Sequence, residues 1–230
     1  MNLKTSTAPE NPNQAETHRQ LLEAAGEVFA ETGFRDATVR EICRRANANI
    51  AAVNYHFGDK EALYKEVLRY SQQKALQKYP PLLGVAADAP PEKKLRAFVH
   101  SLLLRIFDKG PTSWHGKLMS REMIDPTAAM DSVIEERIRP MSEQLWKIVG
   151  EILDCPVNDE RVRLCSFSVV SQCVFYFHCR VIVSRLFPAQ EMDAAYVEKL
   201  ADHITRFSLA AMKHLPEAKT SKSHSNATRN

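Results

Sequence analysis

Hydrophobic residues recur every three or four positions along most of this 230-residue chain. That interval is the period of an α-helix, so the pattern predicts helices and gives no convincing strand. The chain has only 7 glycines, so long runs are free of the residues that interrupt helices. We therefore expect an all-α protein with about nine helices.

Breaks in this pattern set the ends of the helices. Gly33 and Pro80 follow hydrophobic runs, and a Pro- and Ala-rich stretch at 84–91 precedes another run. The expected helices span about residues 17–33, 38–46, 49–57, 59–79, 95–106, 114–123, 125–152, 158–187 and 196–211. Pro140 lies inside the seventh of them and should kink it, because proline lacks a backbone N–H donor.

Two short helices in the N-terminal part have well-defined ends. Thr38 is a good N-cap, and Glu41 follows at the spacing of a capping box. Asn47 tolerates the left-handed conformation that ends a helix, and Asn49 can cap the next one. Two short capped helices joined by a tight turn are typical of a helix-turn-helix, although any small three-helix bundle remains an alternative.

The second of these helices is expected to turn Val53 and Phe57 towards the core. Its exposed positions are expected to be Ile50, Ala52, Asn54, Tyr55 and His56. An asparagine suits an adenine edge, and small apolar side chains suit a thymine methyl group. Tyrosine and histidine can reach phosphates or bases. This face therefore fits the DNA major groove.

The helix after the motif begins with an unfavourable charge. Asp59 caps it, but Lys60 lies in its first turn, where the helix dipole disfavours a cation. An anion from outside would remove the conflict, so we expect Lys60 to contact a DNA phosphate. Thr38, Arg40 and Asn49 complete the expected set of DNA contacts.

Four short motifs follow one another through this region. They are Ala30-Glu31-Thr32-Gly33-Phe34, Thr38-Val39-Arg40-Glu41-Ile42, Asn54-Tyr55-His56-Phe57 and Lys60-Glu61-Ala62-Leu63. In this order they resemble the DNA-binding domain of the TetR family of transcriptional repressors, over about residues 17–67. Asn47 stands where that family usually has Gly, and Asn54 where it often has Tyr, so base recognition should differ.

A second resemblance lies further along the chain. The run Arg121-Glu122-Met123-Ile124-Asp125-Pro126, followed by Ile138-Arg139-Pro140, is similar to the ligand domain of the CecR-type subgroup. The two resemblances together imply a dimer whose effector favours a state with its heads spaced wrongly for DNA.

Charge gives only local support for nucleic-acid binding. The net charge is +3, and acidic residues balance basic ones through the first seventy positions. The basic residues that fall within the motif are Arg35, Arg40, Arg44, Arg45 and Lys60.

The expected helix at 158–187 is apolar nearly all round, which indicates that it is covered on every side. A homodimer would cover it if this helix and the last one formed a four-helix bundle across a two-fold axis. A central helix in a monomeric bundle is the alternative. In the dimer, a charge at Phe177 or Phe207 should separate the protomers or unfold them.

Residues 164–183 reach membrane-spanning length, but Gln172, His178 and Arg180 would be costly in lipid, so we expect no membrane partner.

Two of the expected helices carry residues suited to a small-molecule site with aromatic walls and a few polar groups. These candidates are Trp114, His115, Met119 and Glu122 on one helix and Gln172, Tyr176, Cys179 and Arg180 on the other. A buried Arg180 needs a partner, which is either Glu122 or an acidic group of the effector. If Glu122 is the partner, the pair is structural and the aromatic residues fill the core.

Nothing in the sequence indicates an enzyme. The 5 cysteines form no Cys-x-x-Cys pair, which argues against a disulfide framework and a zinc site and suits a reducing cytoplasm. The chain opens without a charged-then-apolar signal peptide. We see no phosphate-binding glycine loop, metal-ligand cluster or activated nucleophile, so we expect neither a cofactor nor a metal.

These observations divide the chain into four parts. We expect a flexible arm at 1–15, a helix-turn-helix domain with its connecting helix at 16–83, an effector-binding and dimerisation domain at 84–216, and a disordered tail at 217–230. The expected function is a cytoplasmic, ligand-responsive repressor that binds double-stranded operator DNA as a homodimer through its last two long helices. A helical protein-binding module is the alternative, and an all-helical enzyme is disfavoured.

Overall fold

The computed structural model describes residues 12–108, 110 and 114–215, and throughout that part the only regular elements are helices. The expectation of an all-α protein is confirmed. The elements are α1 (Pro12–Asp36), α2 (Val39–Arg45), α3 (Ile50–Phe57), α4 (Lys60–Lys78), α5 (Pro91–Ile106), α6 (Trp114–Ile124), α7 (Ala129–Val133), the π-helical turn η1 (Ile134–Ile138), α8 (Arg139–Leu153), α9 (Glu160–His178), α10 (Arg180–Leu186) and α11 (Ala194–Lys213). Two of the long runs are each divided, which is why there are more helices than expected.

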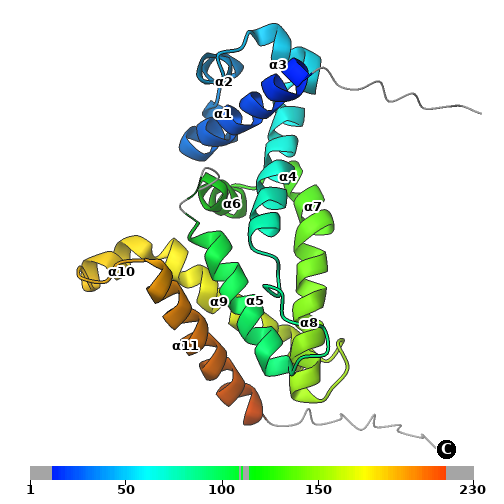
Figure 1. The fold of residues 1–230 in the computed structure, drawn as a ribbon, viewed down its shortest axis with the longest axis vertical. Coiled ribbons are helices and arrows are strands. Elements are labelled where there is room, and N and C mark those ends of the chain that lie inside the picture. Colours follow the sequence, from blue (N-terminus) through cyan, green and yellow to red (C-terminus); the bar gives the residue numbers. More distant parts are fainter. Residues whose placement is uncertain (1–11, 109, 111–113, 216–230) are drawn as a thin grey trace, which may run out of the picture.

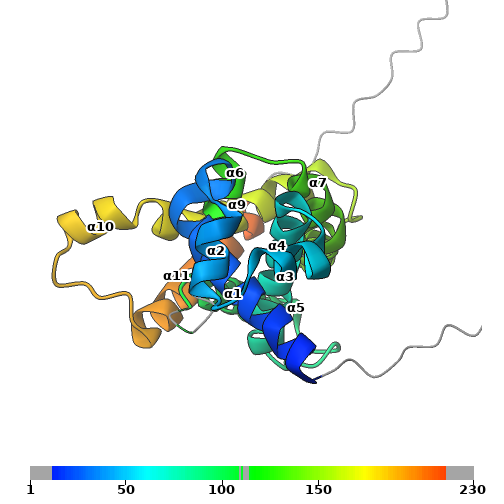
Figure 2. The same cartoon turned by 90° about the horizontal axis from the view of Figure 1, so that it is seen from above.

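Helices α1–α3 form a head at one end of the molecule, and α4 runs from this head towards the remaining helices (Figure 1). The body contains α5, α8, α9 and α11, which pack around one hydrophobic core. Helix α10 extends away from the body in both views (Figures 1 and 2). The fold therefore places a small helical head and a helical body at the two ends of α4.

Helix α1 begins at Pro12, earlier than the periodicity predicted, and so includes the last residues of the arm expected at 1–15. Gly33 adopts φ +86°, a conformation open to glycine, and interrupts the helix where a stop was predicted. Residues 1–11, where the rest of the arm was expected, lie outside the described residues, as does the expected tail at 217–230.

Pro140 disturbs its helix through a π-helical turn. The turn η1 precedes α8, and Pro140 occupies the first turn of α8. A proline has no N–H to donate and its ring crowds the carbonyl four residues earlier, so the wider turn accommodates it. The sequence thus predicted that Pro140 disturbs this helix, and the structure shows that the disturbance is a π-helical turn.

The long apolar helix expected at 158–187 is in fact two helices. It breaks at Cys179 into α9 and α10, which are bent by 68° relative to each other. Among the described residues no single helix is long and apolar enough to span a membrane, and only this bent pair passes on length and composition. The break leaves α10 without a single buried residue.

The head core extends beyond the head helices themselves. Trp114 and Leu118 of α6 and Val133 of α7 join the buried cluster of α1–α4. The indole of Trp114 lies against Gly26, where an added Cβ would overlap the ring. Helices α6 and α7 are therefore packed onto the head, although they follow the break at 84–91.

Candidate functional site

The helix-turn-helix forms as predicted from its local signals. Thr38 accepts a hydrogen bond from the backbone N–H of Glu41, and Asn49 accepts one from Ala52. Asn47 has φ +50°, the left-handed conformation expected of it. The tight turn between α2 and α3 is therefore set by residues within the motif.

Only half of the predicted capping box exists. The carboxylate of Glu41 does not return to the start of α2, because Arg44 and Arg45 bind it at 2.7–2.8 Å. These hydrogen bonds lower the pKa of Glu41 to about 2. Only the hydrogen bond predicted between the Glu41 carboxylate and the start of α2 is missing, because Thr38 caps the helix as expected.

Helix α3 buries Val53 completely and Phe57 in part, as predicted. Its outer face exposes 51% of Ile50 and 71% of Tyr55, and Asn54 is exposed beside them. Ala52 was expected on this face but is half-buried and packs against the head core.

His56 is the other residue of this face that is only partly exposed. Its ring lies against His18 of α1, at 5.5 Å between ring centroids, and against Tyr55 at 5.0 Å. Gln14 donates a hydrogen bond of 3.4 Å to the hydroxyl of Tyr55. The first turns of α1 therefore support the end of α3.

Lys60 was expected to resolve its unfavourable position by binding a phosphate, and the structure gives a different explanation. Its ammonium group donates to the carbonyl oxygens of Phe34 and Ala37, at 2.9 and 3.0 Å, and more weakly to Arg35 at 3.3 Å. It also lies 4.7 Å from the centroid of the Phe34 ring. Lys60 therefore binds the carbonyls that the end of α1 leaves free, which ties α4 to α1.

Most of the other basic side chains of the motif form ion pairs within the protein. Arg45 pairs with Glu31 at 2.7 Å, Arg44 with Glu41 at 2.7 Å, and Arg35 with Asp125 at 3.0 Å. Arg40 is exposed and has no ion pair within the described part of the chain. Arg40 is therefore the basic residue of the motif best suited to a DNA phosphate.

Replacing Lys60 and Arg40 should separate these two roles. Lys60→Met should lower the unfolding free energy by about 1–2 kcal/mol, because it leaves partly buried carbonyls without a donor. Arg40→Met should leave stability within about 0.5 kcal/mol of the parent but flatten the salt dependence of DNA binding by about one unit. Urea denaturation and DNA titrations over a salt series measure the two effects. A flattened slope in Lys60→Met with unchanged stability would show that the roles are exchanged.

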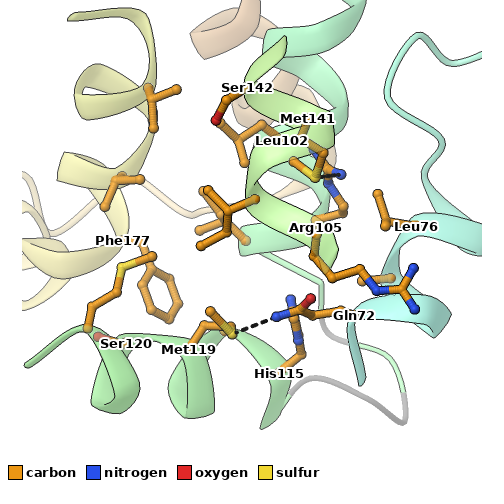
Figure 3. A pocket seen from close by; sticks show the side chains of 18 of the residues that line it. Gln72, Leu76, Leu102, Arg105, His115, Met119, Ser120, Met141, Ser142 and Phe177 are labelled. Carbon is orange, nitrogen blue, oxygen red and sulfur yellow. Dashed lines mark hydrogen bonds between the residues drawn. The ribbon is translucent and has the colours of Figure 1, made fainter. Parts of the chain in front are cut away.

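A cavity of about 220 Å³ lies where α4, α5, α6, α8 and α9 meet (Figure 3). Its walls are mainly apolar, as small-molecule sites require. The lining residues are Gln72, Ala75, Leu76, Phe98, Leu102, Arg105, Ile106, His115, Gly116, Met119, Ser120, Met123, Arg137, Ile138, Met141, Ser142, Leu145, Val170, Val174, Phe177 and His178.

Of the residues predicted from the sequence, His115 and Met119 line this cavity. Trp114 and Glu122 lie on the same helix but are buried towards the head. The stripe predicted on the helix that became α9 points elsewhere, since Gln172 donates to Ser208 of α11 at 3.2 Å and Tyr176 packs against the body core. Cys179 lies at the break between α9 and α10.

The expected pair of Glu122 and Arg180 does not form. Arg180 is exposed on α10, donates to the carbonyl of Phe177 at 3.0 Å and stacks on that residue's ring. Glu122 is fully buried and accepts from the hydroxyl of Tyr64 at 2.6 Å and from the backbone and hydroxyl of Thr127 at 2.8 Å. The premise of a buried Arg180 was therefore wrong, because the helix breaks just before it.

Apart from His115, the polar groups of the cavity were not predicted from the sequence. Arg105 of α5 exposes only 5% of its surface, and its Nη1 donates to the sulfur of Met141 at 3.4 Å. Burial lowers the pKa of Arg105 to about 10. Gln72 of α4 and Arg137 of η1 also face the cavity. A lone arginine between Leu102-Leu103-Leu104 and Ile106 was the available signal.

His115 is neutral near neutral pH. Burial lowers its pKa to about 4, and the positive charge of Arg105 contributes to the shift. Its Nδ1 lies 2.9 Å from the hydroxyl of Ser71 on α4. His115 therefore adds a neutral polar group to the wall and joins α6 to α4.

Helix α6 touches both the cavity and the head. His115, Met119 and Ser120 line the cavity, whereas Arg121 donates to the carbonyls of Ala30 and Glu31 at 2.9 and 2.6 Å. Together with the Glu122 and Asp125 contacts described above, this joins the segment 121–126 to α1 and α4. Helix α6 therefore connects the wall of the cavity to the head through direct hydrogen bonds.

No set of three His, Cys, Asp or Glu side chains that could hold a metal occurs within the described residues, and the five cysteines are free thiols. The geometry thus shows a helix-turn-helix with an exposed α3 and a separate apolar cavity.

Comparison with known proteins assigns a family to both parts of the chain. Residues 21–67 match the family model described as bacterial regulatory proteins, tetR family, and residues 91–212 match the C-terminal domain of the HTH-type transcriptional dual regulator CecR. The chain belongs to the TetR family of transcriptional regulators. Both resemblances seen in the sequence are confirmed, and as a member of this family the protein is a DNA-binding regulator and not an enzyme.

Individual relatives agree with the TetR assignment. The dual regulator CecR of Shigella flexneri is 32% identical over 163 residues, which cover 67% of this chain and 72% of that protein. The regulator UidR of Escherichia coli (strain K12) is 31% identical over 85 residues, covering 36% of this chain but only 40% of that protein. The crystal structure of the TetR family regulator PfmR from Thermus thermophilus superposes with a TM-score of 0.61 at 19% identity, covering 83% of this chain and 94% of that one, and shows the shared fold.

Proposed function

We propose that this protein is a homodimeric repressor that binds a palindromic operator and is released from it by a small molecule. The observation that carries the proposal is the arrangement of α4 and α6, which line the cavity and also bind α1 of the head. A small molecule that fits one arrangement of these helices better than another shifts the population of head positions.

The proposed DNA interface is the outer face of α3 with the starts of α2 and α3. Ile50, Asn54 and Tyr55 are its most exposed members, and Ala52 and His56 lie at its edge. Thr38, Arg40 and Asn49 would contact the backbone. We assign Lys60 to the support of α4, because its ammonium already binds three carbonyls.

Homodimerisation is supported by the outer surfaces of α9 and α11. Leu164, Phe167 and Phe175 of α9 are each more than half exposed, as is Phe207 of α11. An exposed apolar surface of this kind marks a site of protein association. A second copy of the chain would cover it and set two heads side by side, as a two-fold operator with half-sites about one helical turn apart requires.

The names of two relatives bear on the direction of regulation. The relative from Shigella flexneri is named a dual regulator, whereas a relative from Mycolicibacterium smegmatis is named a repressor. We propose repression as the primary action, because heads bound at an operator occupy that DNA without the help of any additional domain. A regulator that binds DNA works where the DNA is, so the proposal includes a cytoplasmic location.

Asn54→Ala tests the proposed base contact. It should cost about 1–3 kcal/mol at one operator position and relax the preference for the base there, because an asparagine amide pairs with an adenine edge. Footprinting first locates the operator, and titrations against single-base variants then measure the preference. Equal losses of affinity for operator DNA and random DNA would contradict the assignment. The control variant is Asn47→Gly, which changes a residue outside α3.

The salt dependence of DNA binding distinguishes the proposed function from its rival, in which the head binds a protein. Binding of the whole dimer to bulk duplex DNA should weaken steeply with salt, because phosphate contacts release counterions. Salt-independent or absent binding to DNA would overturn the proposed function.

A further inference from the structure

Arg105 is an unpaired cation inside an apolar cavity. It is 5% exposed, and its Nε and Nη2 have no hydrogen-bond partner. Its Nη1 reaches only a sulfur, the thioether of Met141, which is a weak acceptor. A buried charge without a partner is unfavourable, so a side chain held in this way is suited to a ligand that supplies the missing acceptor.

The surrounding polar groups do not supply that acceptor. Arg137 brings a second guanidinium to the cavity, and its buried Nε also has no partner. His115 is neutral, and the nearby Asp108 is bound by Lys78 at 2.6 Å. No lining residue in the described part of the chain carries a carboxylate, so the cavity has an excess of positive charge.

The remaining walls are suited to a hydrocarbon body. Leu102, Ile106, Met119, Leu145 and Val174 are among the apolar side chains that line the cavity. The cavity of about 220 Å³ is larger than the roughly 150 Å³ that accepts a benzene molecule. It therefore has room for one ring or a short alkyl chain together with an acid group.

We infer that the effector of this protein is an organic anion, a small apolar body with a carboxylate or similar acid group that binds the guanidinium of Arg105. This inference rests on the proposed function of the cavity. A carboxylate takes two parallel hydrogen bonds from a guanidinium, which Nε and Nη2 are free to donate. The unpaired Oε1 of Gln72 on α4 lies in the same cavity and accepts from any hydroxyl that the ligand carries.

The first test measures stability without a ligand. Arg105→Met should raise the melting temperature or leave it unchanged, because it removes an unpaired buried charge. Arg96→Met is the matched control on the same helix and should lower the melting temperature, because Arg96 binds Glu198 and Asp202 at 2.8 and 2.7 Å. A fall in Arg105→Met as large as that in Arg96→Met would overturn the inference, since it would reveal a structural partner.

The second test measures binding by calorimetry, with benzoate and octanoate as probes and benzamide and octanamide as their neutral counterparts. At least one acid should bind the parent protein about 10- to 100-fold more tightly than its amide, the range that hydrogen bonds to a charged group provide. Arg105→Met should abolish this preference, and Arg96→Met should keep it. Equal binding of acid and amide, or no binding of either, overturns the inference.

An operator-release titration with the same compounds keeps this inference separate from the proposed function. An amide that releases the operator as well as its acid would support the effector cavity and overturn the preference for an anion. An acid that binds through Arg105 without changing operator affinity would support the anion site and overturn the proposed release mechanism.

Discussion

Replacing Phe167 with Glu is expected to convert the dimer into monomers and to weaken operator binding by about 100-fold or more, because two linked heads bind far more tightly than one. Phe167 is 58% exposed at the middle of the apolar stripe on α9. A carboxylate there would have to be buried against the partner without a counter-charge. Light scattering should then report the mass of one chain, 26.1 kDa.

Ile124→Glu is the control for this change. Ile124 is 77% exposed at the end of α6, outside α9 and α11. The same substitution there should leave the dimer intact. A parent protein that is already monomeric at micromolar concentration, or a dimeric Phe167→Glu variant, would rule out this surface as the interface. Of the two positions first considered, Phe177 lines the cavity, whereas Phe207 remains exposed.

Replacing Glu122 with Ala should lower the unfolding free energy by about 3 kcal/mol or more, because it leaves buried donors without an acceptor. The donors are the hydroxyl of Tyr64 and the backbone and side chain of Thr127. Burial raises the pKa of the Tyr64 hydroxyl, and its hydrogen bond to Glu122 raises this pKa further, so the proton stays on the tyrosine throughout the accessible pH range.

Tyr64→Phe provides the matched comparison for Glu122→Ala. It removes one donor but leaves Glu122 bound to Thr127, so the loss should be only about 1–2 kcal/mol. Urea denaturation of the two single variants and the double variant gives the coupling between them. Losses below about 0.5 kcal/mol in both, the range of ordinary surface changes, would show that this network does not hold α6 to α4.

The family motifs and the helix-turn-helix could be predicted from the sequence because their determinants are local. Thr38, Asn47 and Asn49 each act within one helical turn, through a cap or a left-handed backbone conformation. The periodic spacing of apolar residues located the helices for the same reason. The break at Cys179 was not predicted, because an apolar run carries no local sign of where it bends.

The cavity was predicted to exist, but most of its lining residues were not identified. A helix that is apolar nearly all round does not reveal which side faces which neighbour. The sequence therefore did not show that Val170, Val174 and Phe177 face the cavity while Gln172 faces α11. From the sequence, Arg180 was expected to be the buried arginine that needs a partner, but it is exposed. The buried one is Arg105, on a helix that the sequence assigned only to the core.

The sequence by itself determined the helices, the caps of the helix-turn-helix and the family, since these depend on neighbours along the chain. Only the tertiary structure decided which charges meet. Lys60 reaches the carbonyls of α1, Glu122 binds Tyr64, and Arg105 stays unpaired inside the cavity. These outcomes depend on how distant helices are rotated and packed against one another, and packing joins residues whose spacing in the sequence carries no record of the contact.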